Sequence, residues 1–140
     1  MSFVLLLTSC TRPPTEPEKV FEQIHSGKAQ LDEIKKYDYE TQWAIYELGM
    51  YREPPMLQLA EPLASEGKPM FEFLINKLSK SQEELDFIHA ILIIDDMQHS
   101  KSYNVCSDVD DLITLKRFSI KIKDAGWRKS YEESIIDLCQ

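Results

Sequence analysis

The sequence predicts an all-α fold of about six to eight short helices, packed in antiparallel pairs. Apolar side chains recur at the three- and four-residue spacing of amphipathic helices through most of the chain. Prolines, glycines and helix-capping sequences separate these periodic segments at short intervals. Only 118–123 alternates with a period of two, and we prefer a helix there because no partner strand is visible.

The first helix follows a capping box, in which Thr15 is the N-cap and Glu18 the third helical residue. Gly27 ends this helix, and a short helical turn follows around 31–34. A stronger helix spans 39–51, because apolar side chains form one stripe along it.

Prolines and glycines then delimit the next helices. Pro54 ends the preceding helix, and Pro55 opens the next one as its first residue. Pro62 should kink that helix, and Gly67 closes it. Pro69 opens a further amphipathic helix.

Ser81 and Glu84 form a second capping box, which starts a helix over 85–98. This helix is apolar nearly all round, so we expect it to be the central buried helix. Residues 107–110 cap the next helix, whose apolar face is Leu112, Leu115, Phe118 and Ile122. Gly126 breaks the chain before the last helix, whose face is Trp127, Tyr131, Ile135 and Leu138.

The charge of the chain limits its partners. Twenty-four acidic and sixteen basic residues give a net charge of −8. No long basic block exists, so we expect no nucleic-acid partner. The acidic excess also argues against direct electrostatic adsorption to anionic lipid.

The N-terminal segment Leu7-Thr8-Ser9-Cys10 follows an apolar run and resembles the lipobox of bacterial lipoproteins. The resemblance implies a signal peptide over 1–9, truncated because it lacks a basic leader, so that translation starts upstream. It implies that Cys10 becomes the lipidated N-terminus, followed by a proline-rich tether over 10–17 and a single domain over 18–140. Two or more acyl chains would anchor the protein stably.

This resemblance implies a location in the bacterial envelope, anchored to the outer or inner membrane and facing the periplasm. A transmembrane anchor is not expected, because spanning a bilayer needs roughly 20 apolar residues. The alternative is a cytoplasmic protein whose apolar N-terminus is not a signal.

Whether the cysteines pair depends on whether the protein is exported. If Cys10 is lipidated, Cys106 and Cys139 remain, and an exported compartment permits a disulfide between them. The alternative is two buried free thiols.

The stretch 43–78 resembles a HEAT-type helical repeat, in which helix pairs stack into scaffolds that bind other proteins. The resemblance lies in Ala44, Leu48 and Gly49, the Pro54-Pro55 turn, Leu59 through Leu63, and the sequence from Pro69 to Leu74. A single repeat cannot bury its own face, so neighbouring helices must complete it. A compact helical bundle is the alternative.

The strongest candidates for chemistry are Asp95, Asp96 and His99. Asp95 and His99 lie four residues apart on one helix face and could share a metal. A catalytic metal site needs three protein ligands and an open position, and no further ligand pair is visible. We therefore predict no catalytic residue, no metal and no cofactor.

Aromatic residues concentrate in one region, as either core or a partner-binding surface: Tyr37, Tyr39, Trp43, Tyr46 and Tyr51. The sequence therefore favours a non-enzymatic envelope lipoprotein that acts as an adaptor or scaffold by binding another protein. The alternative is an immunity or inhibitor protein that blocks a basic toxin or hydrolase in the envelope. A hydrolase that uses Asp95, Asp96 and His99 is the least favoured hypothesis.

Overall fold

Helices make up the regular structure of residues 12–140, the part of the chain that the computed structural model describes. Seven α-helices and four 3-10 helices occur there without any strand, which confirms the predicted all-α class. The elements are α1 (Glu16–His25), η1 (Leu31–Lys36), α2 (Tyr39–Met50), η2 (Leu57–Leu59), α3 (Ala60–Ser65), α4 (Lys68–Lys80), α5 (Glu84–Ser100), η3 (Val105–Ser107), α6 (Val109–Arg117), η4 (Phe118–Lys121) and α7 (Ala125–Leu138).

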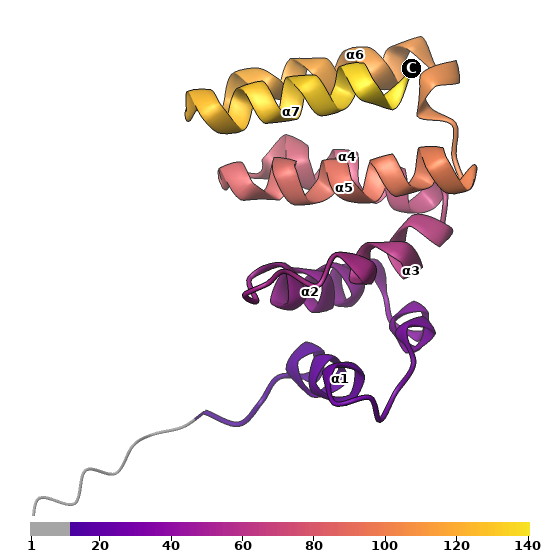
Figure 1. The fold of residues 1–140 in the computed structure, drawn as a ribbon, viewed down its shortest axis with the longest axis vertical. Helices are drawn as coiled ribbons and strands as arrows, with labels where there is room; N and C mark the ends of the chain where they lie inside the picture. The colour runs from indigo at the N-terminus through magenta and orange to yellow at the C-terminus, as the bar shows by residue number, and fades with distance from the viewer. Residues whose placement is uncertain (1–11) are drawn as a thin grey trace, which may run out of the picture.

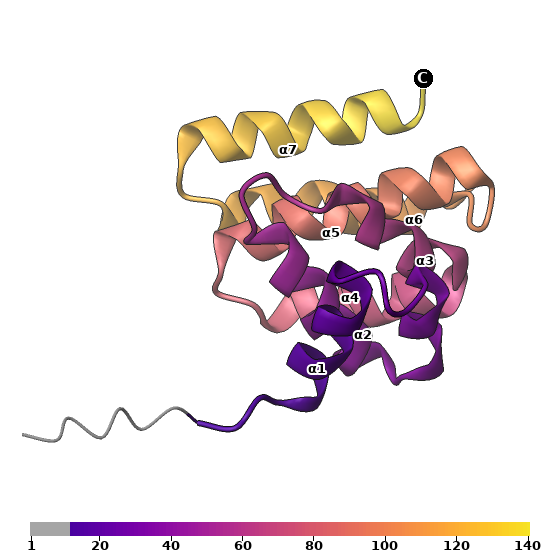
Figure 2. The same ribbon diagram turned by 60° about the horizontal axis from the view of Figure 1, so that its bottom comes forward.

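The helices are stacked in layers of antiparallel pairs (Figure 1). The pairs α2–α3, α4–α5 and α6–α7 form three successive layers, and α1 with η1 lies below them. Helix α5 packs between α3 and α7 and so joins all three layers. The turns within the three pairs lie along one edge of the stack, on the left in Figures 1 and 2.

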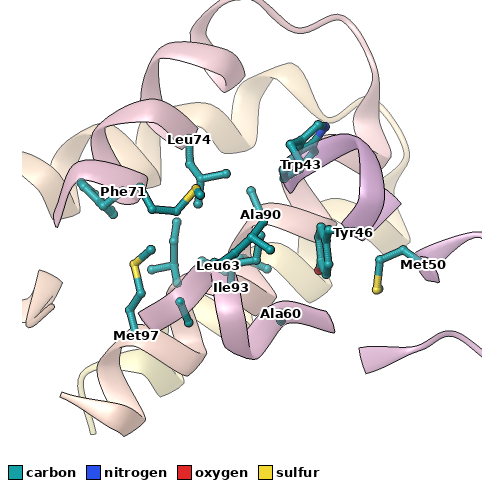
Figure 3. Packing of buried hydrophobic residues seen from close by; sticks show 14 of the residues in the cluster. Trp43, Tyr46, Met50, Ala60, Leu63, Phe71, Leu74, Ala90, Ile93 and Met97 are labelled. Carbon is teal, nitrogen blue, oxygen red and sulfur yellow. The ribbon is translucent and has the colours of Figure 1, made fainter. Parts of the chain in front are cut away.

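The core is centred on α5, as its all-round apolar sequence predicts. Side chains from α2, α3 and α4 gather against this helix (Figure 3). The labelled members of this cluster are Trp43, Tyr46, Met50, Ala60, Leu63, Phe71, Leu74, Ala90, Ile93 and Met97. Burial of such side chains stabilises each layer against the next.

The first capping box forms as predicted. The Thr15 hydroxyl accepts a hydrogen bond from the Glu18 N–H, and the Glu18 carboxylate accepts one from the Thr15 N–H. Because Thr15 is the N-cap, α1 already includes Glu16 and Pro17, so the helix begins before the expected domain boundary at residue 18. Cys10 and the expected signal segment lie outside the described residues.

The second predicted capping box is wrong. Helix α5 has Glu83 at its N-cap, two residues later than the predicted N-cap Ser81. The Ser81 hydroxyl accepts from the Glu83 N–H at 3.0 Å and donates to Asp86 Oδ2 at 2.6 Å. The Glu84 carboxylate instead accepts hydrogen bonds from the main-chain N–H groups of Lys123 and Asp124.

Three further helix boundaries differ from the prediction. Helix α3 begins only at Ala60, after η2, so Pro62 falls in the first turn, where a missing N–H breaks no helical hydrogen bond and causes no kink. The Asp124 carboxylate accepts from the Trp127 N–H at 2.8 Å, so α7 starts before Gly126 rather than after it. Helix α6 ends at Arg117 and continues as η4, not as one helix to Ile122.

Lys121 links the second layer to the third. Its ammonium group donates to the carbonyl oxygens of Leu78, at 3.1 Å, and Ser79, at 2.8 Å, near the C-terminus of α4. It also lies 5.9 Å from the ring centroids of Phe87 and Phe118. The side chain therefore satisfies carbonyls that a helix end leaves without partners, and it does so across layers.

We expect Lys121→Met to lower the free energy of unfolding by about 1–2 kcal/mol, because hydrogen bonds from a charged donor are lost. The measurement is urea denaturation followed by circular dichroism. Lys123→Met is the matched control, since only the main-chain N–H of that residue makes the contact with Glu84. Equal losses in the two variants would contradict the role of the Lys121 ammonium group.

Candidate functional site

A groove runs across the layers on the side of η1, α3, α5 and α7. It consists of three adjoining hollows of about 390, 450 and 280 Å³. The first lies between η1 and α3, the second between α3 and α5, and the third between α5 and α7. Glu61 and Ser65 line both the first and the second hollow, and His99 lines both the second and the third.

The charged side chains that line this groove are predominantly acidic. The carboxylates are Asp32, Glu61, Asp95, Asp96 and Asp137, and the basic groups are Lys35 and His99. We call this feature the acidic groove. A negatively charged groove of this kind is complementary to a positively charged ligand.

The predicted cluster of Asp95, Asp96 and His99 lies in the groove, but its two carboxylates diverge. Asp96 lines the hollow toward α3, whereas Asp95 lines the hollow toward α7. Adjacent residues of a helix point in directions about 100° apart, which explains the separation. No group of three or more His, Cys, Asp or Glu side chains in residues 12–140 could hold a metal ion.

Local charges shift two pKa values in the groove. Burial raises the pKa of Asp96, and the negative charges of Asp95 and Glu61 raise it further. The pKa of His99 is raised because its Nδ1 bonds the Asp95 carbonyl oxygen at 2.9 Å and lies 3.4 Å from the Asp95 carboxylate. His99 is therefore the groove's pH-sensitive positive group.

The predicted aromatic surface is largely core. Trp43 and Tyr46 are buried, and Tyr37 and Tyr39 are half-buried against the core, so these four cannot form an open contact surface together. Tyr51 alone of the five is well exposed, at 62%. The sequence did not distinguish these roles because the aromatic residues cluster along the chain and not on one face of α2.

A buried pair joins α2 to α5. His89 Nδ1 lies 2.5 Å from Glu47 Oε1, and the Tyr46 hydroxyl donates to the His89 carbonyl oxygen at 2.7 Å. The Tyr51 ring packs edge-on against the imidazole, 5.4 Å between centroids. His89 is therefore a hydrogen-bonded core residue. Sequence reasoning missed Glu47, since 42 positions separate the partners.

Cys106 and Cys139 are joined by a disulfide, with 5.6 Å between their Cα atoms. The bond ties η3, which precedes α6, to the residue that follows α7. It therefore links the two ends of the third layer covalently.

No known protein family, curated protein or solved structure matches this chain. The likeness of 43–78 to a HEAT-type repeat therefore stays a prediction. No helix within residues 12–140 has the length and hydropathy needed to cross a membrane.

Proposed function

We propose that the chain is an exported bacterial lipoprotein, anchored through Cys10, whose helical stack binds another protein without performing catalysis. The lipobox-like sequence supports the anchor. The observation that carries the binding function is the acidic groove, because it extends over elements from every layer of the stack.

The layered architecture suits this role. Stacked helix pairs create extended surfaces that individual helices cannot provide, and such surfaces bind segments of other proteins. The antiparallel layers α2–α3 and α4–α5 span the stretch that resembles a HEAT-type repeat, so we propose a HEAT-like scaffold. The excess of carboxylates predicts a partner that presents a basic segment.

An immunity or inhibitor protein is the second candidate. The same groove and the net charge of −8 would let the domain cover a basic active site in a toxin or hydrolase. The two candidates differ in outcome, because only an inhibitor stops the enzymatic activity of its partner when the purified proteins are mixed.

Site-specific photo-crosslinking in the native host tests the groove. A photoreactive amino acid at Ser65, in the groove, is expected to give a discrete adduct with one protein. The same amino acid at Glu22, an exposed position on α1, is the control and should give none. An absence of adducts at Ser65, or equal adducts at both positions, would refute the groove as the binding site.

We expect Asp96→Asn to weaken this adduct while raising the free energy of unfolding at neutral pH. The raised pKa means that the native state disfavours the ionised carboxylate of Asp96. The resulting loss of stability is full above the raised pKa and decreases as pH falls through it. A neutral amide removes this loss at all pH values, by about 0.5 kcal/mol because water screens the open groove. Thermal denaturation at several pH values measures it, with Glu22→Gln as the neutral control.

Mass spectrometry of the mature protein tests the anchor separately. The expected result is an N-terminal Cys10 that carries acyl chains. An unmodified peptide that extends through Cys10 would refute the anchor and favour the cytoplasmic alternative, whatever the groove binds.

A further inference from the structure

The edge of the stack that contains the three hairpin turns exposes apolar side chains. We call it the hairpin edge, and it comprises residues 51–57, 81–83 and 118–127 (left side in Figures 1 and 2). Seven large hydrophobic residues in the described part of the chain are well exposed. Four of them belong to this edge: Tyr51, Leu57, Ile120 and Trp127. Ile120 is 82% exposed and Trp127 is 44% exposed.

The third turn of the hairpin edge is also basic, in contrast to the chain as a whole. Residues 116–129 contain six basic residues and one acidic residue. Lys116, Arg117, Lys123 and Lys129 are exposed to solvent. Asp95, Asp96 and His99 belong to the last turns of α5, whereas the edge meets α5 at its first residues. The third turn is thus basic and the last turns of α5 are acidic, whereas the other two turns of the edge carry Arg52, Glu53 and Glu83.

The chain enters the described structure on the same side. The start of the described chain, drawn in indigo, lies on the left in both ribbon views, as the three turns do; in Figure 1 it lies below the stack, whereas the α6–α7 layer is at the top. Two peptide steps separate residue 12 from Cys10, a span of at most about 7 Å. A lipid attached at Cys10 would therefore anchor the domain from the side of the hairpin edge, next to its lowest layer in Figure 1.

We propose that the hairpin edge rests on an anionic lipid bilayer, with Ile120 and Trp127 at the level of the headgroups. Tryptophan and aliphatic side chains favour this interfacial region, and nearby lysine and arginine side chains are attracted to lipid phosphates. The net charge of −8 does not prevent this, since salt screens charges beyond roughly 8 Å and the local charge of the third turn is positive.

This orientation turns the acidic end of α5 toward the aqueous phase. The groove then stays open to a soluble or membrane-bound partner while the opposite end of the stack meets lipid. The orientation of the domain rests on the proposed anchor at Cys10. The membrane-binding surface itself is inferred from the exposed apolar and basic residues of the turns.

The test uses the full chain with Cys10→Ser, so that no acyl chain contributes. Binding is measured by co-sedimentation with vesicles of two parts phosphatidylcholine and one part phosphatidylglycerol, and with pure phosphatidylcholine vesicles. Because Trp43 is buried, a blue shift in tryptophan emission reports on Trp127. Lipids brominated near the headgroup should quench this emission.

We expect binding to the anionic vesicles alone, with loss at high salt. Replacing Lys116, Lys123 and Lys129 together by glutamine should lower the partition coefficient on the order of a hundredfold, at roughly fivefold per charge. Ile120→Ser should lower it about tenfold. Val109→Ser is the matched control, because Val109 is 68% exposed on the third layer but begins α6, at the end of that helix away from the edge.

Three outcomes would overturn the proposal. The first is the absence of binding to anionic vesicles, and the second is an equal effect of Ile120→Ser and Val109→Ser. The third is a blue shift that grows with protein concentration in lipid-free buffer, which would assign the edge to contacts between protein chains. None of these outcomes bears on acylation of Cys10, which mass spectrometry decides independently.

Discussion

Replacing both Cys106 and Cys139 by alanine is expected to lower the free energy of unfolding by about 3–4 kcal/mol. The disulfide closes a loop with a sequence separation of 33 residues, which includes all of α6, η4 and α7. Without the bond, the unfolded chain gains the conformational freedom of that loop.

Helix α6, the first helix of the third layer, makes few buried contacts besides the disulfide next to it. Leu115 is the one buried residue that α6 contributes. In contrast, α5 buries seven side chains along its length. We therefore expect the loss of the disulfide to be felt first in α6, as faster hydrogen exchange there than in α4 or α5.

Urea denaturation in the Cys10→Ser background measures the change. The reductant-treated parent should reach the midpoint of the alanine double variant, and reductant should leave that variant unaffected. A parent whose midpoint ignores reductant would contradict the prediction. Non-reducing peptide mapping of protein from the native host then shows whether the bond forms there, as an exported location would permit.

Local signals predicted most of the helices but not all of their ends. Thr15 and its reciprocal partner Glu18 lie within one turn, so the sequence alone specifies that cap. Ser81 and Glu84 have the same spacing, yet Glu84 bonds to the chain near residue 123, about 40 positions away. A tertiary contact of Glu84 therefore takes the place of the local capping box. The spacing of Ser81 and Glu84 alone does not indicate this, because the contact depends on residues about 40 positions away.

The site was less predictable than the fold because it depends on distant residues. Asp96 and Glu61 line one hollow although they come from different helices, whereas the neighbours Asp95 and Asp96 face different hollows. The sequence identified the chemistry of these residues but not their grouping. Similarly, the net charge of −8 argued against direct adsorption to anionic lipid, although residues 116–129 are basic.

Gly67→Ala is expected to have the second large effect, a loss of about 3 kcal/mol of unfolding free energy. Gly67 joins α3 to α4 with φ of 71° and ψ of −142°, a conformation that is nearly restricted to glycine. A Cβ atom at this position would also lie 2.8 Å from the carbonyl oxygen of Ser102. The Ser102 hydroxyl donates to the Ala64 carbonyl oxygen at 2.6 Å, so the corner after α5 cannot retreat without breaking that hydrogen bond.

Gly27→Ala separates the two causes of this loss. Gly27 has a similar φ of 78°, but a Cβ atom there would meet nothing within 4 Å. Its replacement should therefore cost only the left-handed backbone conformation, about 1 kcal/mol. Urea denaturation of both variants measures the difference, which reports the contact between the α3–α4 corner and Ser102 together with the ψ of −142° at Gly67. Equal losses would mean that the corner yields to the added methyl group and that backbone conformation alone determines the cost.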